Sequence, residues 1–326
     1  MRKGAKIYIL LVVIVCAFLV LLQQGKIQEW ILDVKGVAGT ATNLVNQGVK
    51  MTDNNLNERM DQMTRREHCT EDLQVAFLNT GDTPCAVVYE PESTLIYGMP
   101  KAGYLSILTQ ELSDNKITSV DTVIIPRLTS EEIDSLKTLK ANVDIKKIII
   151  PEVEINAGAK QSVIETFGEE NTICVKSGDE IEHGKAIYTV LAGNSDTVED
   201  NSLILQVWNA AESYLFAGWA TTAEMAAFVQ SESVTENVIQ MPNETAKNGG
   251  IDITNWIKKL GKSSGYVFQC DTEENGSGLH DDLYRVLRKN EVAYYRTDLQ
   301  GVIRCAGDSN QVRFLIDPAM KYHLGD

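Results

Sequence analysis

The chain has 326 residues, with 30 Lys and Arg against 45 Asp and Glu, which gives a formal net charge of −15. Hydrophobic residues at 44% and charged residues at 23% are typical of a globular protein and exclude a disordered chain. The acidic balance argues against a nucleic-acid partner, because that binding depends on Lys and Arg. The four histidines (His68, His183, His280 and His323) lie far apart, which excludes metal motifs of the HExxH and HxH types.

The N-terminus carries an unbroken apolar run over residues 7–22, IYILLVVIVCAFLVLL. As a helix it spans about 24 Å, slightly less than a hydrocarbon core of about 30 Å. A cleaved signal peptide and an uncleaved signal-anchor are both compatible with such a run. The residues that follow, Gln23, Gln24, Gly25 and Lys26, fit a cleavage site poorly. We therefore predict a transmembrane signal-anchor over residues 7–24.

Charge sets the predicted orientation. Arg2, Lys3 and Lys6 precede the apolar run and should stay in the cytosol, so that residues 1–6 form a cytosolic tail. The remainder of the chain is then extracytoplasmic, and without these three basic residues its net charge is −18. The predicted location is the cell membrane, with a single pass.

Residues 25–70 are predicted to form a helical stalk. Apolar residues recur at spacings of three and four from Ile27 to Val45, which favours a helix, although Gly36, Gly39 and Gly48 weaken it. The stretch after Met51 is polar. The stalk is interpreted either as a surface for pairing with a partner helix, including a second copy of the chain, or as a helix lying on its own domain.

Residues 71–326 change in pattern and are predicted to form one extracytoplasmic domain. Strands are expected at 73–80, at 86–90 and 93–98 as a hairpin, and at 120–126, with a helix at 101–114. A helix follows at 130–141, with Ser130 as its expected N-cap. Further elements are expected in this order: strand 146–151, helix 158–167, strands 172–175, 187–193, 202–208 and 212–218, helix 223–230, strand 238–242, helix 253–261, strand 265–270, helix 281–290, and strands 294–298, 301–307 and 312–316. The alternation predicts an α/β domain with layered sheets and outer helices.

Cysteine content leaves the redox state open. Outside the anchor are Cys69, Cys85, Cys174, Cys270 and Cys305. In an oxidising compartment at most two disulfides can form, and the alternative is buried reduced thiols. None of the five forms a CxxC pair, which argues against a structural zinc knuckle.

Several local phrases in order along residues 73–316 resemble the metallo-β-lactamase fold, and most closely the extracellular domain of ComEC-type competence proteins. They are LNTGDTPCAVVYEPESTLIYGMP, DTVIIP, Ser177-Gly178-Asp179-Glu180-Ile181, NSLILQVWNAAESYLFAG, and Tyr295-Arg296-Thr297-Asp298 with Gly301, Val302 and Ile303. The resemblance implies an αββα sandwich, in which two packed sheets are flanked by helices.

The metal ligands of that family have no counterparts here. Where active members carry His-x-His-x-Asp-His, this chain carries Arg127, Thr129, Glu131 and Glu132. Matched in the same way, the bridging Asp falls on Trp219, the GHHGS loop on residues 242–246 with Asn243 and Glu244, and the late His near His280.

This donor set is unsuited to catalytic zinc, which needs about three protein ligands that include imidazole or thiolate. Arg127 places a permanent positive charge where a cation should sit. We therefore expect no cofactor, with the zinc site lost, and no catalytic residue. Carboxylates at Glu131, Glu132 and Glu244 with His280 are an alternative set for Mg²⁺ or Mn²⁺; the simpler interpretation places both glutamates in a helix first turn.

The sequence thus predicts a membrane-anchored pseudoenzyme that binds an envelope protein or a small ligand at the former active-site cleft. Three alternatives remain. A metal-dependent phosphodiesterase or nuclease would use a rebuilt site. A DNA-uptake accessory protein would need a basic strip around Lys247, Lys258, Lys259 and Lys262. A structural subunit would form a homo-oligomer through the stalk.

Overall fold

The computed structural model of the chain describes residues 73–152, 157–192, 202–209, 212–231, 236–243, 253–260, 263, 265–271, 279–308 and 311–316. The predicted tail, signal-anchor and stalk, residues 1–70, lie outside the described residues. Among the described helices, none is both long and apolar enough to cross a bilayer.

Two mixed sheets form the centre of the domain. The first runs in the order β15 (Gln311–Leu315), β14 (Ile303–Asp308), β1 (Gln74–Phe77), β2 (Ala86–Glu90), β3 (Ser93–Tyr97), β4 (Ser119–Ile124), β5 (Asp144–Pro151) and β6 (Thr172–Val175). The second runs β13 (Tyr294–Arg296), β12 (Gly265–Phe268), β11 (Val238–Gln240), β10 (Glu212–Phe216), β9 (Ile204–Asn209), β8 (Ile187–Ala192) and β7 (Glu180–Ile181).

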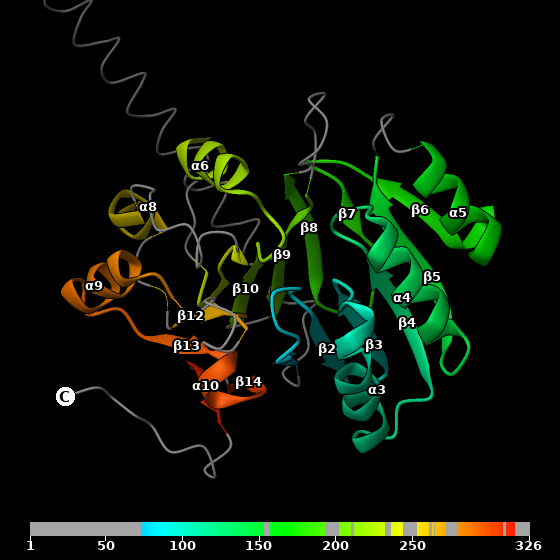
Figure 1. Ribbon diagram of the computed structural model, residues 1–326, viewed down its shortest axis with the longest axis horizontal. Helices are drawn as coiled ribbons and strands as arrows, with labels where there is room; N and C mark the ends of the chain where they lie inside the picture. Colours follow the sequence, from blue (N-terminus) through cyan, green and yellow to red (C-terminus); the bar gives the residue numbers. More distant parts are fainter. Residues whose placement is uncertain are drawn as a thin grey trace, which may run out of the picture. The chain divides into compact units, whose positions relative to one another are not determined.

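Helices cover the outer face of each sheet, and Figure 1 shows the two groups on opposite sides. The first sheet is covered by α3 (Leu105–Asp114), α4 (Ser130–Lys140) and α5 (Ala157–Phe167). The second is covered by α6 (Thr222–Ser231), α8 (Ile253–Leu260) and α9 (Asp281–Lys289). The predicted αββα sandwich is therefore confirmed.

Strand periodicity explains this layering. Along β3, Leu95 and Tyr97 point into the apolar layer between the sheets, while Ile96 points to the helices of the first sheet. A strand alternates its faces at every residue, so a continuous apolar run must be buried on both sides. The Tyr97 hydroxyl donates across the inner layer to the Leu203 carbonyl oxygen at 2.7 Å and the Phe216 carbonyl oxygen at 3.1 Å.

Two local predictions were wrong. The expected strand at 294–298 ends at Arg296, and a short helix, α10 (Thr297–Gln300), follows it. The chain turns there because the Gln300 side chain accepts from the Arg296 amide at 2.7 Å, and Gly301 ends the turn with a φ of +67°. The N-cap of α4 is Thr129, not Ser130, since the Thr129 hydroxyl accepts from the Glu132 amide at 3.2 Å.

Candidate binding cleft

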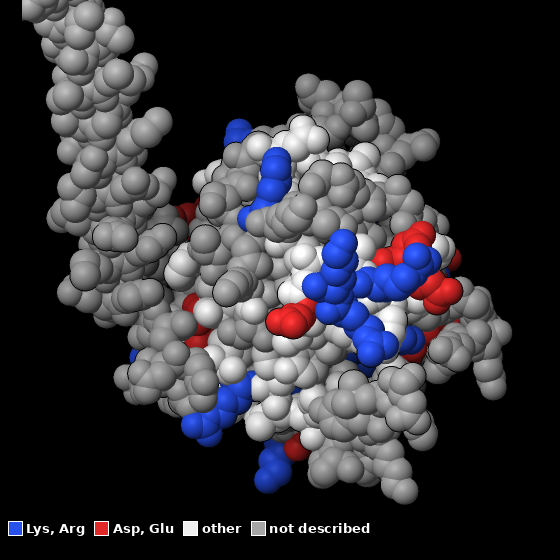
Figure 2. All heavy atoms as spheres, turned by 90° about the vertical axis from the view of Figure 1, so that its left-hand side faces the viewer, with Lys and Arg blue, Asp and Glu red and all other residues white. Residues whose placement is uncertain are grey.

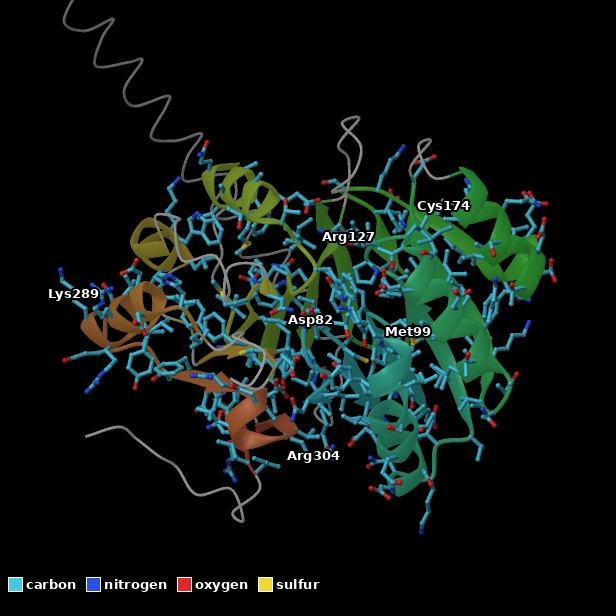
Figure 3. All side chains as sticks on the ribbon, viewed as in Figure 1. Asp82, Met99, Arg127, Cys174, Lys289 and Arg304 are labelled. Carbon is cyan, nitrogen blue, oxygen red and sulfur yellow. The ribbon has the colours of Figure 1, made fainter. Side chains whose placement is uncertain are left out.

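A cleft of about 400 Å³ lies at one edge of the sandwich. It is lined by Asp82, Thr83, Met99, Lys101, Thr129, Ser130, Glu131, Glu132 and Trp219. These residues come from the loops that follow β1, β3 and β10, and from Thr129 and the first turn of α4, which follow β4. Strands β3 and β4 are parallel, so their carboxyl ends meet at this edge, where open α/β sheets commonly bind ligands. Figure 3 shows Asp82, Met99 and Arg127 near one another between the two groups of helices.

The turn between β1 and β2 forms one wall. The Thr80 hydroxyl donates to the Thr83 carbonyl oxygen at 2.7 Å, and the Thr83 hydroxyl donates to the Thr80 carbonyl oxygen at 3.0 Å. Gly81 within this turn has a φ of +66°, and a Cβ there would lie 2.7 Å from the Tyr104 ring. The turn holds Asp82 in place, and Lys101 Nζ pairs with its carboxylate at 2.9 Å.

The first turn of α4 forms the facing wall. Thr129 caps this helix, and Glu131 and Glu132 lie in its first turn, where acidic side chains are favoured by the helix dipole. Glu131 is exposed, whereas Glu132 is only 2% exposed. The two adjacent carboxyl groups therefore differ: one lies in solvent at the rim, and the other is buried at the base of the cleft.

Burial raises the pKa of Glu132 well above its ordinary value. Thr129, the Arg127 guanidinium and the Met99 main chain oppose this by favouring the carboxylate. The burial effect is larger, so the surroundings of Glu132 favour the neutral carboxylic acid over the carboxylate. A neutral acid can donate one hydrogen bond as well as accept.

Arg127 does not line the cleft but ties loops together behind it. Its guanidinium donates to the Trp219 carbonyl oxygen at 2.9 Å and to the Ser202 hydroxyl at 3.2 Å, and lies 4.0 Å from the Glu224 carboxylate. Glu224 in turn accepts from the Ser202 amide at 2.6 Å. A charged guanidinium is therefore anchored between the end of β4 and the start of α6.

Trp219 occupies the position that follows β10. Its indole N–H donates to the Pro84 carbonyl oxygen at 2.7 Å, which joins this loop to the start of β2. Gly98 lies against this contact with a φ of +77°; a Cβ there would lie 2.2 Å from the same carbonyl oxygen and 2.5 Å from the indole nitrogen. Because Gly98 has no side chain, the Trp219 indole can occupy the space beside it.

Asn243 joins the same corner, although it is not among the lining residues. Its side-chain amide donates to the Asp82 carbonyl oxygen, and its main-chain amide donates to the Gly218 carbonyl oxygen at 3.0 Å. It thus connects the end of β11 with the β1–β2 turn. Glu244, predicted beside it, lies outside the described residues.

Two glutamines that the sequence analysis did not select form a buried chain of amides under the cleft. Gln240 accepts from the Gly218 amide at 3.1 Å and donates to Gln269. Gln269 donates to the carbonyl oxygens of Leu78 and Cys85, both at 2.7 Å. The sequence feature that could have indicated them is a glutamine near the end of an otherwise apolar strand: Gln240 in VIQMP and Gln269 in GYVFQC.

His280 lies away from the cleft. It is the N-cap of α9, where its Nδ1 accepts from the Asp282 amide at 3.3 Å, and α9 packs on the second sheet. Helix α4 with Glu131 and Glu132 packs on the first sheet. The alternative set that combined these glutamates with the histidine is therefore not assembled by the described residues.

The donors at the cleft do not fit a zinc ion. Arg127 and Trp219 supply no lone pair. The other side chains at the cleft offer only oxygen atoms, from carboxyl groups, hydroxyls and the Asn243 amide, whereas catalytic zinc needs imidazole or thiolate among its ligands. Across the described part of the chain, no three His, Cys, Asp or Glu side chains are placed to hold a metal.

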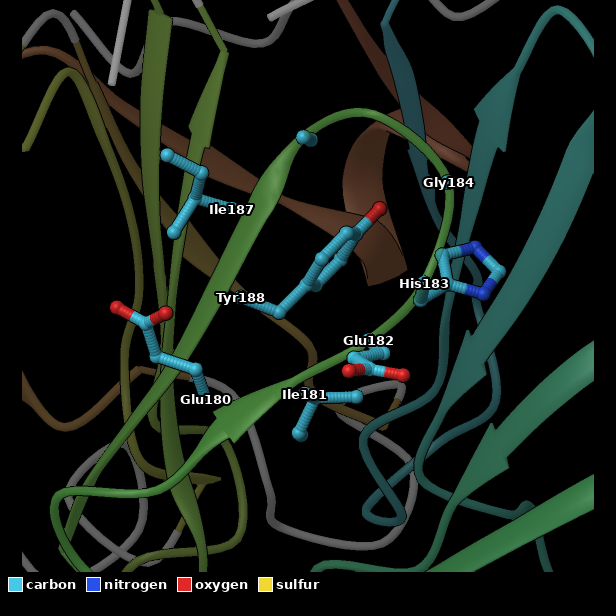
Figure 4. Close-up of a pocket in the computed structure, with 8 residues that line it drawn as sticks. Glu180, Ile181, Glu182, His183, Gly184, Ile187 and Tyr188 are labelled. Carbon is cyan, nitrogen blue, oxygen red and sulfur yellow. The ribbon is translucent and has the colours of Figure 1, made fainter. Parts of the chain in front are cut away.

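A second hollow of about 430 Å³ lies at the β7–β8 hairpin, shown in Figure 4. His183 in this loop is buried, and its Nδ1 lies 3.0 Å from the Thr122 hydroxyl of β4. Glu90 of β2 accepts from the amides of Lys185 and Ala186 at 2.6 and 3.0 Å and from the Tyr188 hydroxyl at 2.7 Å. These bonds lock the loop of the second sheet to the first sheet.

Of the four lysines that the nucleic-acid alternative needs, only Lys259 has a described side chain. Lys259 is exposed on α8, but Lys247 and Lys262 lie outside the described residues. Figure 2 shows Lys and Arg side chains on one face of the molecule, with acidic side chains beside them. On α9, Arg285 pairs with Asp282 at 2.5 Å. These neighbouring charges of opposite sign partly cancel.

Four of the cysteines are described, and all four are free thiols: Cys85, Cys174, Cys270 and Cys305. Burial raises the pKa of the Cys85 and Cys305 thiols and raises that of Cys270 to about 12. Such thiols stay protonated and are poor nucleophiles. Cys69 lies outside the described residues.

Among known proteins, no family model matches this chain, and neither does any curated protein. The chain is similar to the metallo-β-lactamase-fold protein YhfI from Bacillus subtilis, with 12% identity, a TM-score of 0.46, and coverage of 74% of this chain and 99% of that one. It is also similar to CmlA, a diiron β-hydroxylase from Streptomyces venezuelae, with 10% identity, a TM-score of 0.45, and coverage of 76% of this chain and 54% of that one.

The chain thus spans about half the length of CmlA. A diphosphatase of the PhnP family is similar at 10% identity and a TM-score of 0.42, with coverage of 68% of this chain and 94% of that one. These likenesses concern chain architecture and assign no activity to this chain.

Proposed function

We propose that this protein is a membrane-anchored, extracytoplasmic binding module: a metallo-β-lactamase-like domain, closest to the extracellular domain of ComEC-type competence proteins, that has lost its metal ligands. Its cleft between the β1–β2 turn and the first turn of α4 binds a small ligand or an envelope protein. The proposal treats the domain as a pseudoenzyme.

The hydrogen bonds of the Arg127 and Trp219 side chains are the observation that carries this proposal. By the sequence resemblance both stand at metal-ligand positions, yet each makes hydrogen bonds that hold loops together. A guanidinium at this place repels a divalent cation, and its charge cannot be removed by deprotonation at any physiological pH. In this proposal the loops at this edge of the sandwich keep their arrangement, while their side chains no longer include the metal ligands of the family.

The sequence alone supports the membrane anchor. The apolar run after Arg2, Lys3 and Lys6 suits a single span, and the basic residues favour a cytosolic N-terminus. A domain held at the outer surface by one span suits recognition of envelope components.

Metal analysis of the full-length chain tests the proposal. The chain is produced in a bacterial host and purified in detergent without added metal, and its metal content is measured by mass spectrometry before and after incubation with Zn²⁺ or Mn²⁺. We expect recovery from the membrane fraction and metal far below one ion per chain. A zinc enzyme purified in parallel controls for metal loss. One or two tightly held ions per chain would overturn the proposal and favour the hydrolase alternative, to be followed by phosphodiesterase and nuclease assays.

A further inference from the structure

A buried polar cluster joins the two sheets at the β7–β8 loop, residues 182–186, and none of its members lines the candidate cleft. The loop belongs to the second sheet, but its bonds cross to Glu90 of β2 and Thr122 of β4 in the first sheet. The side chains of His183, in the loop, and of Glu90 are each only 2% exposed. A titratable base and a titratable acid are therefore enclosed together between the sheets.

One carboxylate holds most of this loop. Glu90 accepts hydrogen bonds from the amides of Lys185 and Ala186 and from the Tyr188 hydroxyl of β8. Gly184 has a φ of +53°, and a Cβ there would collide with the Glu90 carboxylate, so the loop backbone passes close to it. On its other side the loop leads only to β7, a two-residue strand at the edge of the second sheet. The loop is therefore attached by few bonds, which is typical of segments that open locally.

The imidazole of His183 has a partner at only one of its two nitrogens. Its Nδ1 lies 3.0 Å from the Thr122 hydroxyl. Its Nε2 has no hydrogen-bond partner among the described residues and lies 4.0 Å from Glu90 Oε1, which is beyond hydrogen-bond distance. A neutral imidazole carries one N–H and can donate it to Thr122, but an imidazolium carries two. The closed loop therefore suits the neutral ring and leaves the second N–H of a protonated ring without an acceptor.

The charges around His183 come from three strands of the first sheet and from the loop itself. Burial lowers the pKa of His183, whereas Glu90 and Asp121 of β4 favour its protonated form and Lys147 of β5 disfavours it. The other titratable side chains nearby are Tyr188, whose ring centroid lies 5.2 Å from that of the imidazole, and the exposed Glu182 and Lys185 of the loop. Burial outweighs the two carboxylates, so the enclosed ring takes up a proton less readily than a ring in water.

We propose that the β7–β8 loop is a pH-dependent switch, in which protonation of His183 releases residues 182–186 from Glu90 and Thr122. The loop is closed on the first sheet at neutral pH, and on acidification it opens so that the imidazolium reaches water. In the open loop His183 titrates as an ordinary histidine, near pH ~6.5, so opening takes up a proton and is favoured below that pH. The switch lies outside the candidate cleft and does not depend on the proposed function.

Hydrogen–deuterium exchange of the full-length chain in detergent tests this inference. Exchange is followed by mass spectrometry at pH 7.5 and pH 5.5, with labelling times scaled to the chemical exchange rate at each pH. The amides of Lys185 and Ala186 report on the loop, because they donate to Glu90 while it is closed. Their protection factor should fall by about threefold to tenfold at pH 5.5. The upper limit of about tenfold applies to one group that titrates near pH ~6.5 in the open loop and not at all in the closed one.

The amides of β5 distinguish local opening from unfolding of the domain. This strand lies inside the first sheet, between β4 and β6. At both pH values its amides should be at least about tenfold better protected than those of the loop, because the loop opens without the sheet.

Two variants assign the response to His183. His183→Gln keeps a side-chain N–H for Thr122 but does not titrate, so its loop should be equally protected at both pH values. Glu182→Gln removes an exposed carboxylate from the same loop and should respond to pH as the unmutated chain does. A pH series on the unmutated chain decides the question even if His183→Gln does not fold. The loss of protection must begin near pH ~6.5 and follow the uptake of no more than one proton.

Four results would each overturn the switch. The first is loop protection that stays constant or rises on acidification, and the second is a pH response that persists in His183→Gln. The third is equal protection of the loop and β5, which would mean that the loop opens only when the domain unfolds. The fourth is a loss of protection that begins only below about pH 5, where carboxyl groups titrate. The metal analysis decides the pseudoenzyme proposal independently of all four.

Discussion

At the scale of single residues, the contact between Trp219 and Pro84 depends on one glycine. Gly98 has a positive φ, where a side chain is strained, and its missing Cβ leaves space for the Trp219 indole and the Pro84 carbonyl. Gly98→Ala should destabilise the domain by about 2 kcal/mol or more, because it combines backbone strain with a steric clash. The measurement is urea unfolding followed by circular dichroism.

Gly103 supplies the matched control for that substitution. A Cβ at Gly103 would have no neighbouring atom within 4 Å. Gly103→Ala should therefore change the free energy of unfolding by no more than about 0.5 kcal/mol. Equal stability of the two variants would mean that the indole contact does not constrain the fold.

At the scale of elements, the loop between β7 and β8 gives the domain a pH dependence. Burial lowers the pKa of His183, although Glu90 and Asp121 nearby favour its protonated form, while Lys147 disfavours it. The folded state therefore binds a proton less readily than the unfolded chain, whose histidine titrates near pH ~6.5. This contribution to stability is present above that pH and is lost as the pH falls below it.

One histidine variant measures this contribution. Between pH 7 and pH 5, His183→Gln should lose less stability on acidification than the unmutated chain. Thermal unfolding of both proteins at each pH gives the difference, and identical slopes for the two would contradict the assignment to His183.

Most elements were predictable, because their patterns are local. The apolar runs at 120–126 and 146–151 correspond to β4 and β5, and the acidic start of the 130–141 helix corresponds to α4. The short helix α10 was missed because its turn depends on Gln300 reaching back to the amide of Arg296. A local pattern does not reveal such a side-chain contact.

The candidate cleft was predictable only in part, for a similar reason. Glu131, Glu132 and Trp219 follow from the order of motifs in the fold that the sequence resembles, and all three line the cleft. Asp82 and Lys101 were not selected, since their pairing joins residues from separate loops. The Gln240–Gln269 amide chain joins two strands of one sheet to the other sheet, which only tertiary structure displays.

At the scale of the whole domain, an ion pair joins its beginning to its end. Glu111 of α3 is 5% exposed and accepts from both terminal nitrogens of Arg304 in β14, each at 2.6 Å. Burial alone would raise the pKa of Glu111, but Arg304 and the Tyr89 hydroxyl together lower it. The pair stabilises the fold above the ordinary pKa of a glutamate and loses that effect as the pH falls below it.

Removing one partner of the Glu111–Arg304 pair should lower the stability of the domain strongly, whereas removing one partner of a surface ion pair should lower it little. Arg304→Ala leaves a buried carboxylate without its cation and should destabilise the domain by about 3 kcal/mol. Arg285→Ala breaks an exposed pair on α9 and should cost no more than about 1 kcal/mol. Chemical unfolding at pH 7 compares them, and similar small losses for both would show that the Glu111 pair is not the stronger one.

The position of β1 also has a consequence for how the protein is made. β1, the first strand of the domain, lies between β2 and β14, and Gln74 pairs with Ala306. A chain that leaves the ribosome N-terminus first therefore completes its first sheet only after nearly all of its residues have been synthesised. Until then one edge of β1 stays open, and open strand edges invite aggregation. Biosynthesis of this protein should depend on chaperones that shield that edge until the last strands arrive.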